Sequence, residues 1–189
     1  MARLLNGSAT KIGPLAVAAL LALVLPVRES RGEDGYELWL RYRPEPDAAL
    51  RADFTAYCGG GVVAPDRPVI AAARAELERA LTAILPGTGT GGLVYLGTRA
   101  DHPAVAAAVS PEELALLGDE GFVLRAGEWN GRRVLVVAGT TDRGVLHGTF
   151  ALLRHLQLGQ PLAGWSLADA PRVHELIANQ WDNPVRTAS

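Results

Sequence analysis

The stretch FVLRAGEWNGRRVLVVA, residues 122–138, decides the fold of this 189-residue chain. At its centre, Asn130-Gly131 is the dipeptide preferred in a two-residue type I′ turn, so the residues on either side are expected to form a β-hairpin. The second arm ends in VLVVA, which is apolar throughout. Such a run is typical of a strand that is covered on both faces or lies in the middle of a sheet.

A long helix is expected directly after the hairpin, over about residues 143–158. Thr141 or Asp142 can cap its first turn, and a glycine and a proline follow its end. Two glycines on this helix, Gly144 and Gly148, would let its backbone approach the sheet closely because they lack side chains. Its largely apolar residues form two adjacent rows along the helix: Val145, Leu146, Thr149, Phe150, Leu152, Leu153 and Leu156.

The other expected elements alternate along the chain, and the order indicates the α/β fold class. We therefore expect one mixed β-sheet with helices packed on it. Periodicity predicts strands at residues 35–42 and 93–96, helices at residues 47–57, 68–85 and 111–117, and a further extended run at residues 172–178.

Local signals mark the ends of two of these helices. Asp66 can cap the helix at residues 68–85. Ser110 and Glu113 have the form of a capping box, in which Glu113 reaches back to the serine. The run GTGTGG, residues 87–92, follows a helix and opens a strand, which is the reverse of a phosphate-binding loop, so it is interpreted as a connecting loop.

The composition suits a packed globular domain, with 49% hydrophobic and 20% charged residues. The length suggests one domain. The formal net charge is −2 and the arginines are scattered, whereas a protein that binds a nucleic-acid backbone carries a basic stripe. Nucleic acid is therefore not expected among the partners.

The N-terminal residues have the layout of an export signal. Arg3 and Lys11 precede the uncharged run LAVAALLALVL at residues 15–25. This run has the length of the apolar part of a signal peptide and is too short to span a bilayer comfortably, and a buried helix is the alternative. We expect a signal peptide over residues 1–30, an exported protein (periplasmic or secreted), and a folded part that begins near Gly35.

Neither cysteine nor histidine forms a metal-binding or nucleophilic pattern. Cys58 is the only cysteine, which excludes an internal disulfide and indicates a buried or idle thiol. The histidines lack the spacing of zinc ligands and are interpreted as surface or interface side chains. They are His102, His147, His155 and His174. No metal and no other cofactor is therefore expected.

Acidic side chains raise the possibility of glycoside hydrolysis, which needs two carboxyl groups placed across the scissile bond. The candidates are Asp119-Glu120, Glu112-Glu113 and Asp142. Each is better explained by a structural role, in a turn, a capping box and a helix N-cap respectively. The sequence therefore predicts no catalytic residue in this chain.

The stretch NQWDNP, residues 179–184, has the composition of a sugar-binding site. Trp181 can stack on a sugar face while the amides and the carboxylate hold hydroxyl groups. The alternative is a polar turn in which Trp181 packs against the protein. The residue types alone favour neither interpretation.

Four stretches together resemble the N-terminal region of the α-glucuronidase family, glycoside hydrolase family 67. They occur in the same order, from about Gly35 to Asn183. The third stretch alone also resembles the non-catalytic N-terminal domains of β-hexosaminidases, which use a similar Asp-x-Gly-x-x-x-Gly pattern. The stretches are GYELWLRY (35–42), LGDEGFVLR (117–125), TDRGVLHGTFALLRHLQLGQPL (141–162) and APRVHELIANQWDN (170–183).

The resemblance implies a β-hexosaminidase-like α/β domain over residues 35–170, followed by the start of a truncated (β/α)₈ barrel at residues 171–189. It also implies an enzyme that removes α-1,2-linked (4-O-methyl)glucuronic acid from xylan-derived oligosaccharides, with inversion of configuration and without a metal. The acid and base carboxylates of the family lie on barrel strands, beyond this chain. Trp181 matches a tryptophan that helps form the family's uronic-acid pocket.

Two features depart from the family's pattern. Gln180 stands where the family usually has histidine, and PVRTAS after Asn183 differs from the usual acidic, glycine-rich continuation. Because the family's acid and base carboxylates lie beyond this chain, we expect a domain that is inactive alone. We also expect residues 172–189 to be poorly ordered or loosely docked. Its expected partners are the catalytic barrel and, through the barrel, glucuronoxylan oligosaccharides. The alternatives are a stand-alone carbohydrate-associated module and the N-terminal domain of a β-hexosaminidase-type enzyme.

Overall fold

The computed structural model describes residues 41–87 and 89–171. Every described helix and strand lies within the unit Tyr42–Ser189. Among the described residues, no helix combines the length and the apolar character needed to cross a membrane.

Three expectations concern residues that the structure does not describe. The signal peptide at residues 1–30 and the extended run at residues 172–178 lie outside the described residues. Most of the strand expected at residues 35–42 also lies outside them. Its last two residues, Arg41 and Tyr42, belong to no helix or strand.

The core of the fold is a mixed five-stranded sheet with the strand order β1-β2-β4-β3-β5. Strands β1, β2 and β4 are parallel to one another, and β3 runs antiparallel to both of its neighbours. The mixed sheet of the predicted α/β class is thus confirmed. The strands are β1 (Val62–Val63), β2 (Leu93–Gly97), β3 (Phe122–Trp129), β4 (Arg132–Gly139) and β5 (Ser166–Asp169).

The predicted hairpin forms the centre of this sheet. Asn130 has a φ of 50° and Gly131 a φ of 73°, the positive values that a type I′ turn requires at both positions. The turn pairs β3 with β4 in register from Trp129 opposite Arg132. Strand β4 has neighbours on both edges and is buried from Val134 onward, as its apolar run predicts.

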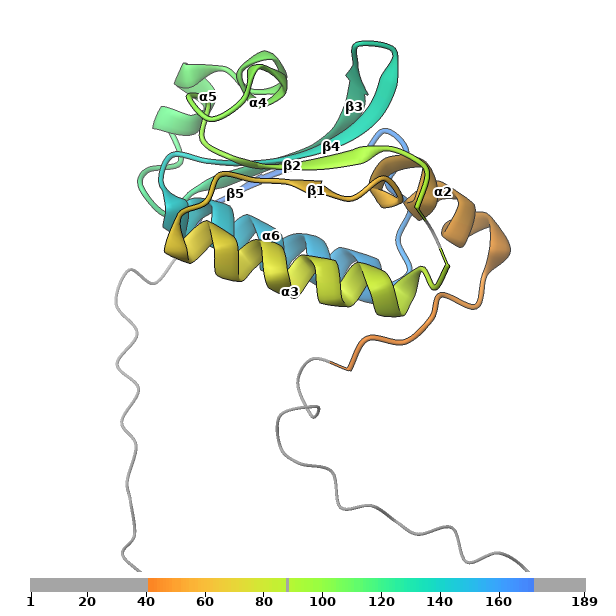
Figure 1. Ribbon diagram of the computed structural model, residues 1–189. Coiled ribbons are helices and arrows are strands. Elements are labelled where there is room, and N and C mark those ends of the chain that lie inside the picture. Colours follow the sequence, from red (N-terminus) through yellow and green to blue (C-terminus); the bar gives the residue numbers. More distant parts are fainter. Residues whose placement is uncertain (1–40, 88, 172–189) are drawn as a thin grey trace, which may run out of the picture. The chain divides into compact units, whose positions relative to one another are not determined.

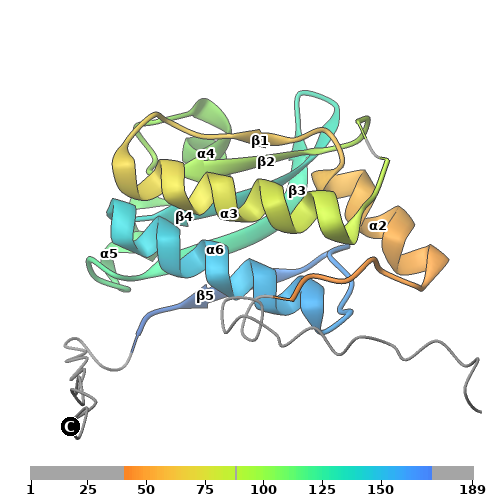
Figure 2. The ribbon, with the colours of Figure 1, turned by 60° about the horizontal axis from the view of Figure 1, so that its bottom comes forward.

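Helices cover both faces of the sheet (Figure 1). The two long helices, α3 (Pro68–Ile84) and α6 (Asp142–Gln157), lie side by side on one face (Figure 2). Helix α2 (Ala48–Cys58) joins the same core through Phe54. The short helices α4 (Pro103–Ala108) and α5 (Pro111–Ala115) cover the opposite face.

Alternation along β4 divides the core into two layers, because successive side chains of a strand point to opposite faces. Leu135 and Val137 pack with α2, α3 and α6. Val134, Val136 and Ala138 pack with α4 and α5. Both layers are therefore built on the single apolar run that the sequence shows at residues 134–138.

The two glycines of α6 allow this helix to contact the sheet closely, as predicted. A Cβ atom at Gly148 would lie 2.9 Å from Val137 Cγ1 and 3.1 Å from Phe122 Cβ. A Cβ atom at Gly144 would collide with the carbonyl oxygen of Gly121. Thr141 caps the helix, because its hydroxyl accepts from the Gly144 N–H at 3.4 Å. Asp142 is the first helical residue and not the cap.

Two predictions about the starts of helices were wrong, one at α3 and one at α5. The residue that caps α3 is Arg67, which makes no side-chain cap bond, so Asp66 is not the cap. At α5, Ser110 accepts from the Glu113 N–H at 3.1 Å, as expected. The Glu113 carboxylate does not complete the capping box and instead accepts from Arg125 Nη2 at 2.6 Å, a charge-assisted hydrogen bond.

Three short elements were not predicted at all: β1, α4 and β5. Each has two to six residues, too few to establish a period. The expected elements at residues 47–57, 68–85 and 93–96 correspond to α2, α3 and β2. The GTGTGG run lies between α3 and β2, as its interpretation as a connecting loop requires.

Candidate functional site

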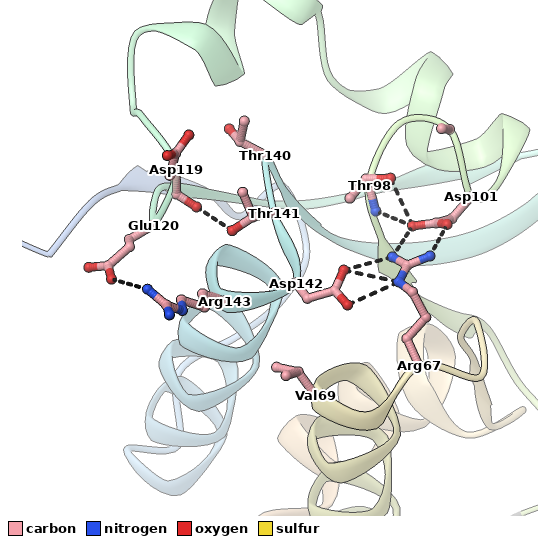
Figure 3. A pocket seen from close by; sticks show the side chains of 11 residues that line it. Arg67, Val69, Thr98, Asp101, Asp119, Glu120, Thr140, Thr141, Asp142 and Arg143 are labelled. Carbon is pink, nitrogen blue, oxygen red and sulfur yellow. Dashed lines mark hydrogen bonds and ion pairs between the residues drawn. The ribbon is translucent and has the colours of Figure 1, made fainter.

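A cavity with a volume of about 850 Å³ lies at the edge of the sheet where β2 and β4 end. Ligands of open α/β sheets generally bind outside the carboxyl ends of the parallel strands, so the location is that of a candidate site. Figure 3 shows that side chains from the loops after β1, β2 and β4 meet here. The lining residues are Arg67, Val69, Thr98, Ala100, Asp101, Asp119, Glu120, Thr140, Thr141, Asp142 and Arg143.

Arg67 is the centre of this pocket and binds two carboxylates at once. Its Nη1 and Nη2 atoms donate to the two oxygens of Asp101 at 2.6 and 2.8 Å. Its Nε and Nη2 atoms donate to Asp142 Oδ1 at 3.0 and 2.8 Å. The guanidinium therefore ties the start of α3 to the loop after β2 and to the start of α6 (Figure 3).

The charge state of Asp101 follows from these contacts. Besides Arg67, the backbone N–H and the hydroxyl of Thr98 donate to Asp101 Oδ2, at 2.7 and 2.8 Å. Hydrogen bonds from Arg67 hold the pKa of the Asp101 carboxyl well below its usual range, with the Thr98 donors acting in the same direction and desolvation opposing them. The hydrogen bonds to Asp101 and Asp142 likewise raise the pKa of Arg67. The pocket thus holds a charged ion-pair cluster at neutral pH.

Three of the acidic residues that the sequence singled out, Asp119, Glu120 and Asp142, line the same pocket, whereas Glu112 and Glu113 do not. The Asp119 carbonyl accepts a hydrogen bond of 2.5 Å from the Thr141 hydroxyl, which fixes the turn before β3 against the start of α6. Glu120 lies 3.8 Å from Arg143. Asp119 and Glu120 lie in the turn before β3, as predicted, whereas Asp142 is not the predicted N-cap of α6 but a partner of Arg67.

The cluster pairs two carboxylates with one guanidinium. A general acid must hold a proton near neutral pH, and a raised carboxyl pKa makes this possible. Here the Asp101 pKa is lowered, and Arg67 contacts both Asp101 and Asp142. The described residues also contain no group of three or more histidine, cysteine or acidic side chains that could hold a metal ion. The geometry supports a structural role, in which the ion pairs of Arg67 hold the start of α3, the loop after β2 and the start of α6 together.

The interpretation of the histidines as surface or interface side chains is wrong for His155, which is buried. His102 caps α4, because its Nδ1 accepts from the Ala104 N–H at 3.0 Å. His155 is buried, stacks on Trp165 with ring centroids 3.7 Å apart, and donates from Nε2 to the Pro161 carbonyl at 3.1 Å. His147 lies beside a groove on α6. His174 lies outside the described residues.

Cys58 is a buried thiol, as predicted. Only 2% of its surface is exposed, and this burial raises the pKa of the thiol well above its usual range, with the charge of Asp53 adding to the effect. The thiolate is the nucleophilic form of cysteine. Cys58 is therefore a core residue and not a nucleophile.

The sequence did not reveal Arg67 or Asp101, the two central residues of the pocket. Their partners are 34 and 75 residues away along the chain, so no local spacing marks them. The feature of the sequence that could have pointed to Arg67 is its position between a short apolar run and a helix that begins with proline. Trp181, the predicted sugar contact, lies outside the described residues.

Comparison with known proteins identifies one family for this fold. The family described as glycosyl hydrolase family 67 N-terminus matches residues 38–152, which is more than half of the chain. No curated protein matches the sequence. The matched residues include the hairpin, the Arg67 cluster and most of α6. The chain therefore belongs to the glycosyl hydrolase family 67 N-terminal domain family, a part of α-glucuronidase-type glycoside hydrolases.

Proposed function

We propose that this chain is the non-catalytic N-terminal domain of an α-glucuronidase that acts in xylan degradation, and that hydrolysis takes place in a (β/α)₈ barrel. The single observation that carries the proposal is the family match over residues 38–152. The pocket chemistry supports it, because inverting hydrolysis needs an acid and a base about 6.5–9.5 Å apart in opposite protonation states. Arg67 stabilises Asp101 in its charged form, which suits neither a proton donor nor a strong base.

The substrate and the location follow from the resemblance to the family. The proposed substrates are xylan-derived oligosaccharides that carry α-1,2-linked (4-O-methyl)glucuronic acid, bound by the barrel. Trp181 is proposed to contact the uronic acid only when the barrel completes the pocket. The uncharged run at residues 15–25 supports an exported protein.

A groove on α6 is the face that we assign to the barrel. It has a volume of about 360 Å³ and lies between α6 and the end of β5, lined by Phe122, Leu146, His147, Phe150, Asp169, Ala170 and Pro171. Phe150 is 41% exposed and Leu158, farther along the same segment, is 59% exposed. Large apolar side chains in an exposed patch mark an interaction surface. Pro171, the last residue of the described range, lines this groove.

The test uses the purified 189-residue chain and a separately produced family 67 barrel that lacks its own N-terminal domain. We expect the chain to bind the barrel, to raise its Tm and to increase its release of methylglucuronic acid from aldouronic acids. Partner binding stabilises the bound protein by mass action. A barrel whose Tm and activity are the same with and without the chain would contradict the proposal.

A matched pair of variants tests the assigned face. Phe150→Asp places a charge in the α6 groove and is expected to weaken binding to the barrel about tenfold or more. Leu116→Asp is the control, because Leu116 is 88% exposed on the segment that follows α5, over the opposite face of the sheet. Equal effects of the two variants would show that the barrel binds elsewhere.

A further inference from the structure

A second cavity lies on the opposite face of the sheet from α6. Its volume is about 220 Å³, and it is formed between the β3–β4 hairpin and α4. Its lining residues are Ala104, Ala107, Ala108, Arg125, Ala126, Gly127, Glu128, Trp129, Val134 and Val136. It shares no residue with the Arg67 pocket or with the α6 groove.

The cavity exists because β3 has a glycine in the middle of this face. Side chains of a strand alternate, so Arg125, Gly127 and Trp129 share the face that α4 and α5 cover. A Cβ atom at Gly127 would meet nothing within 4 Å, which means that open space lies above this residue. Arg125 and Trp129 are about 13 Å apart along the strand, at about 3.3 Å per residue, and bound this space at its two ends.

The walls of the cavity are rigid and mostly apolar. Trp129 is half-buried and packs against the second core layer with part of its ring. Arg125 is fixed at the other end by the Ala108 carbonyl and by Glu113, whose carboxylate lies 2.6 Å from Nη2. Val134 and Val136 form the floor, and α4 contributes only alanine side chains. Because Arg125 is paired with Glu113, its charge is not available to an anionic ligand, which favours a neutral one.

Hydrogen-bonding groups lie along one edge of the cavity. Strand β5 pairs with β3 only as far as Arg125, and the Ala126 N–H donates to the Trp165 carbonyl at 3.0 Å. Alternate residues of a strand direct their N–H and C=O groups to the same edge. The backbone groups of Glu128 therefore point to the edge beyond the end of β5, where no strand among residues 41–87 and 89–171 pairs with them.

We propose that this cavity, formed by Gly127 between Arg125 and Trp129, binds one pyranose ring of a neutral β-linked oligosaccharide such as a xylan chain. An indole ring and an aliphatic floor suit the apolar face of a sugar, and the free backbone groups of Glu128 suit its hydroxyls. The volume of about 220 Å³ equals that of about seven waters, which is enough for one ring. The choice of a xylan chain rests on the proposed function.

The experiment is a titration of the full chain with xylohexaose, followed by NMR and by calorimetry, with cellohexaose as a second neutral chain. We expect saturable binding with shifted Trp129 indole and Gly127 amide signals. Gly127→Val is expected to abolish binding and to leave the Tm unchanged or higher, because a β-branched side chain suits a strand and meets open space. Trp129→Ala is expected to weaken binding about fivefold or more.

Gly89→Val is the matched control, since Gly89 also has nothing within 4 Å of a built Cβ and lies outside the cavity. Retained binding in Gly127→Val, or no saturable binding of either hexaose by the wild-type chain, would overturn the inference. Stabilisation of the barrel without sugar binding would refute the sugar site alone. Sugar binding by a chain that does not associate with the barrel would refute the proposed function alone.

Discussion

The ion-pair cluster of Arg67 gives the sharpest stability prediction. Arg67→Met keeps most of the aliphatic side chain and removes the guanidinium that binds Asp101 and Asp142. The Arg67 side chain is 37% exposed, and those of Asp101 and Asp142 are 12% and 29% exposed. The contacts are thus neither fully solvated nor buried. Their contribution to the free energy of unfolding is therefore expected to lie between those of exposed and buried ion pairs.

The size of the stability loss expected for Arg67→Met follows from this intermediate exposure. Exposed ion pairs contribute about 0–1 kcal/mol, whereas hydrogen bonds to charged groups contribute about 1.5–3 kcal/mol. Two carboxylates at about 1 kcal/mol each, plus the repulsion that remains between them, give a loss of about 2–3 kcal/mol in the free energy of unfolding. In a domain of this size the Tm is expected to fall by roughly 6–10 °C.

The pH dependence provides an independent check on the same cluster. The Asp101 pKa is lowered by folding from its ordinary value of 3.8, so its contribution to stability is present above that pH and is lost as the pH falls below it. Arg67→Met is expected to flatten the loss of stability of the wild-type chain between about pH 5 and pH 2. The assay is urea unfolding followed by circular dichroism at a series of pH values.

A conservative variant separates charge from geometry. Arg67→Lys keeps the positive charge but cannot bind two carboxylates with a planar fork, so about half of the stabilisation should return. The structural role of the cluster would be refuted if the free energy of unfolding of Arg67→Met were within about 0.5 kcal/mol of the wild-type value at neutral pH and had the same acid dependence.

Three further predictions concern the packing and the hairpin turn of the fold. Gly148→Val should cost about 2–4 kcal/mol in urea unfolding, because its side chain would overlap Val137, whereas Gly89→Val should have little effect. Gly131→Val, at a φ of 73°, should cost about 1–2 kcal/mol by the same assay, and an unchanged midpoint would argue against the type I′ turn. Cys58 should react with a thiol reagent only as fast as the protein unfolds, and immediate labelling of the native protein would contradict its burial.

The parts of the fold that the sequence predicts are those with local signals. Asn130-Gly131 defines the hairpin within two residues, and the apolar period of α6 is repeated over four turns. Gly144 and Gly148 predicted the close helix–sheet contact because glycine on a helix face has few other purposes. Each of these arguments needs only neighbours along the chain.

The missed features depend on distant residues. Strand β1 has two residues and exists through its parallel pairing with Val94 and Tyr95 of β2, which no local pattern encodes. Asp66 looked like the cap of α3, but the helix begins at Pro68, as expected, and Arg67 is the residue at the cap position. The candidate site also depends on distant residues, since Arg67 meets its partners only where the loops after three strands come together.

The central claim is that this domain contributes no acid–base chemistry of its own. The most direct test incubates the purified 189-residue chain alone with aldouronic acids and measures the release of 4-O-methylglucuronic acid, with an intact family 67 enzyme as the positive control. We predict no release above the rate without protein. Release that scales with the concentration of the chain and is lost in Asp101→Asn or Asp142→Asn would contradict the account, because it would make the Arg67 pocket a catalytic centre.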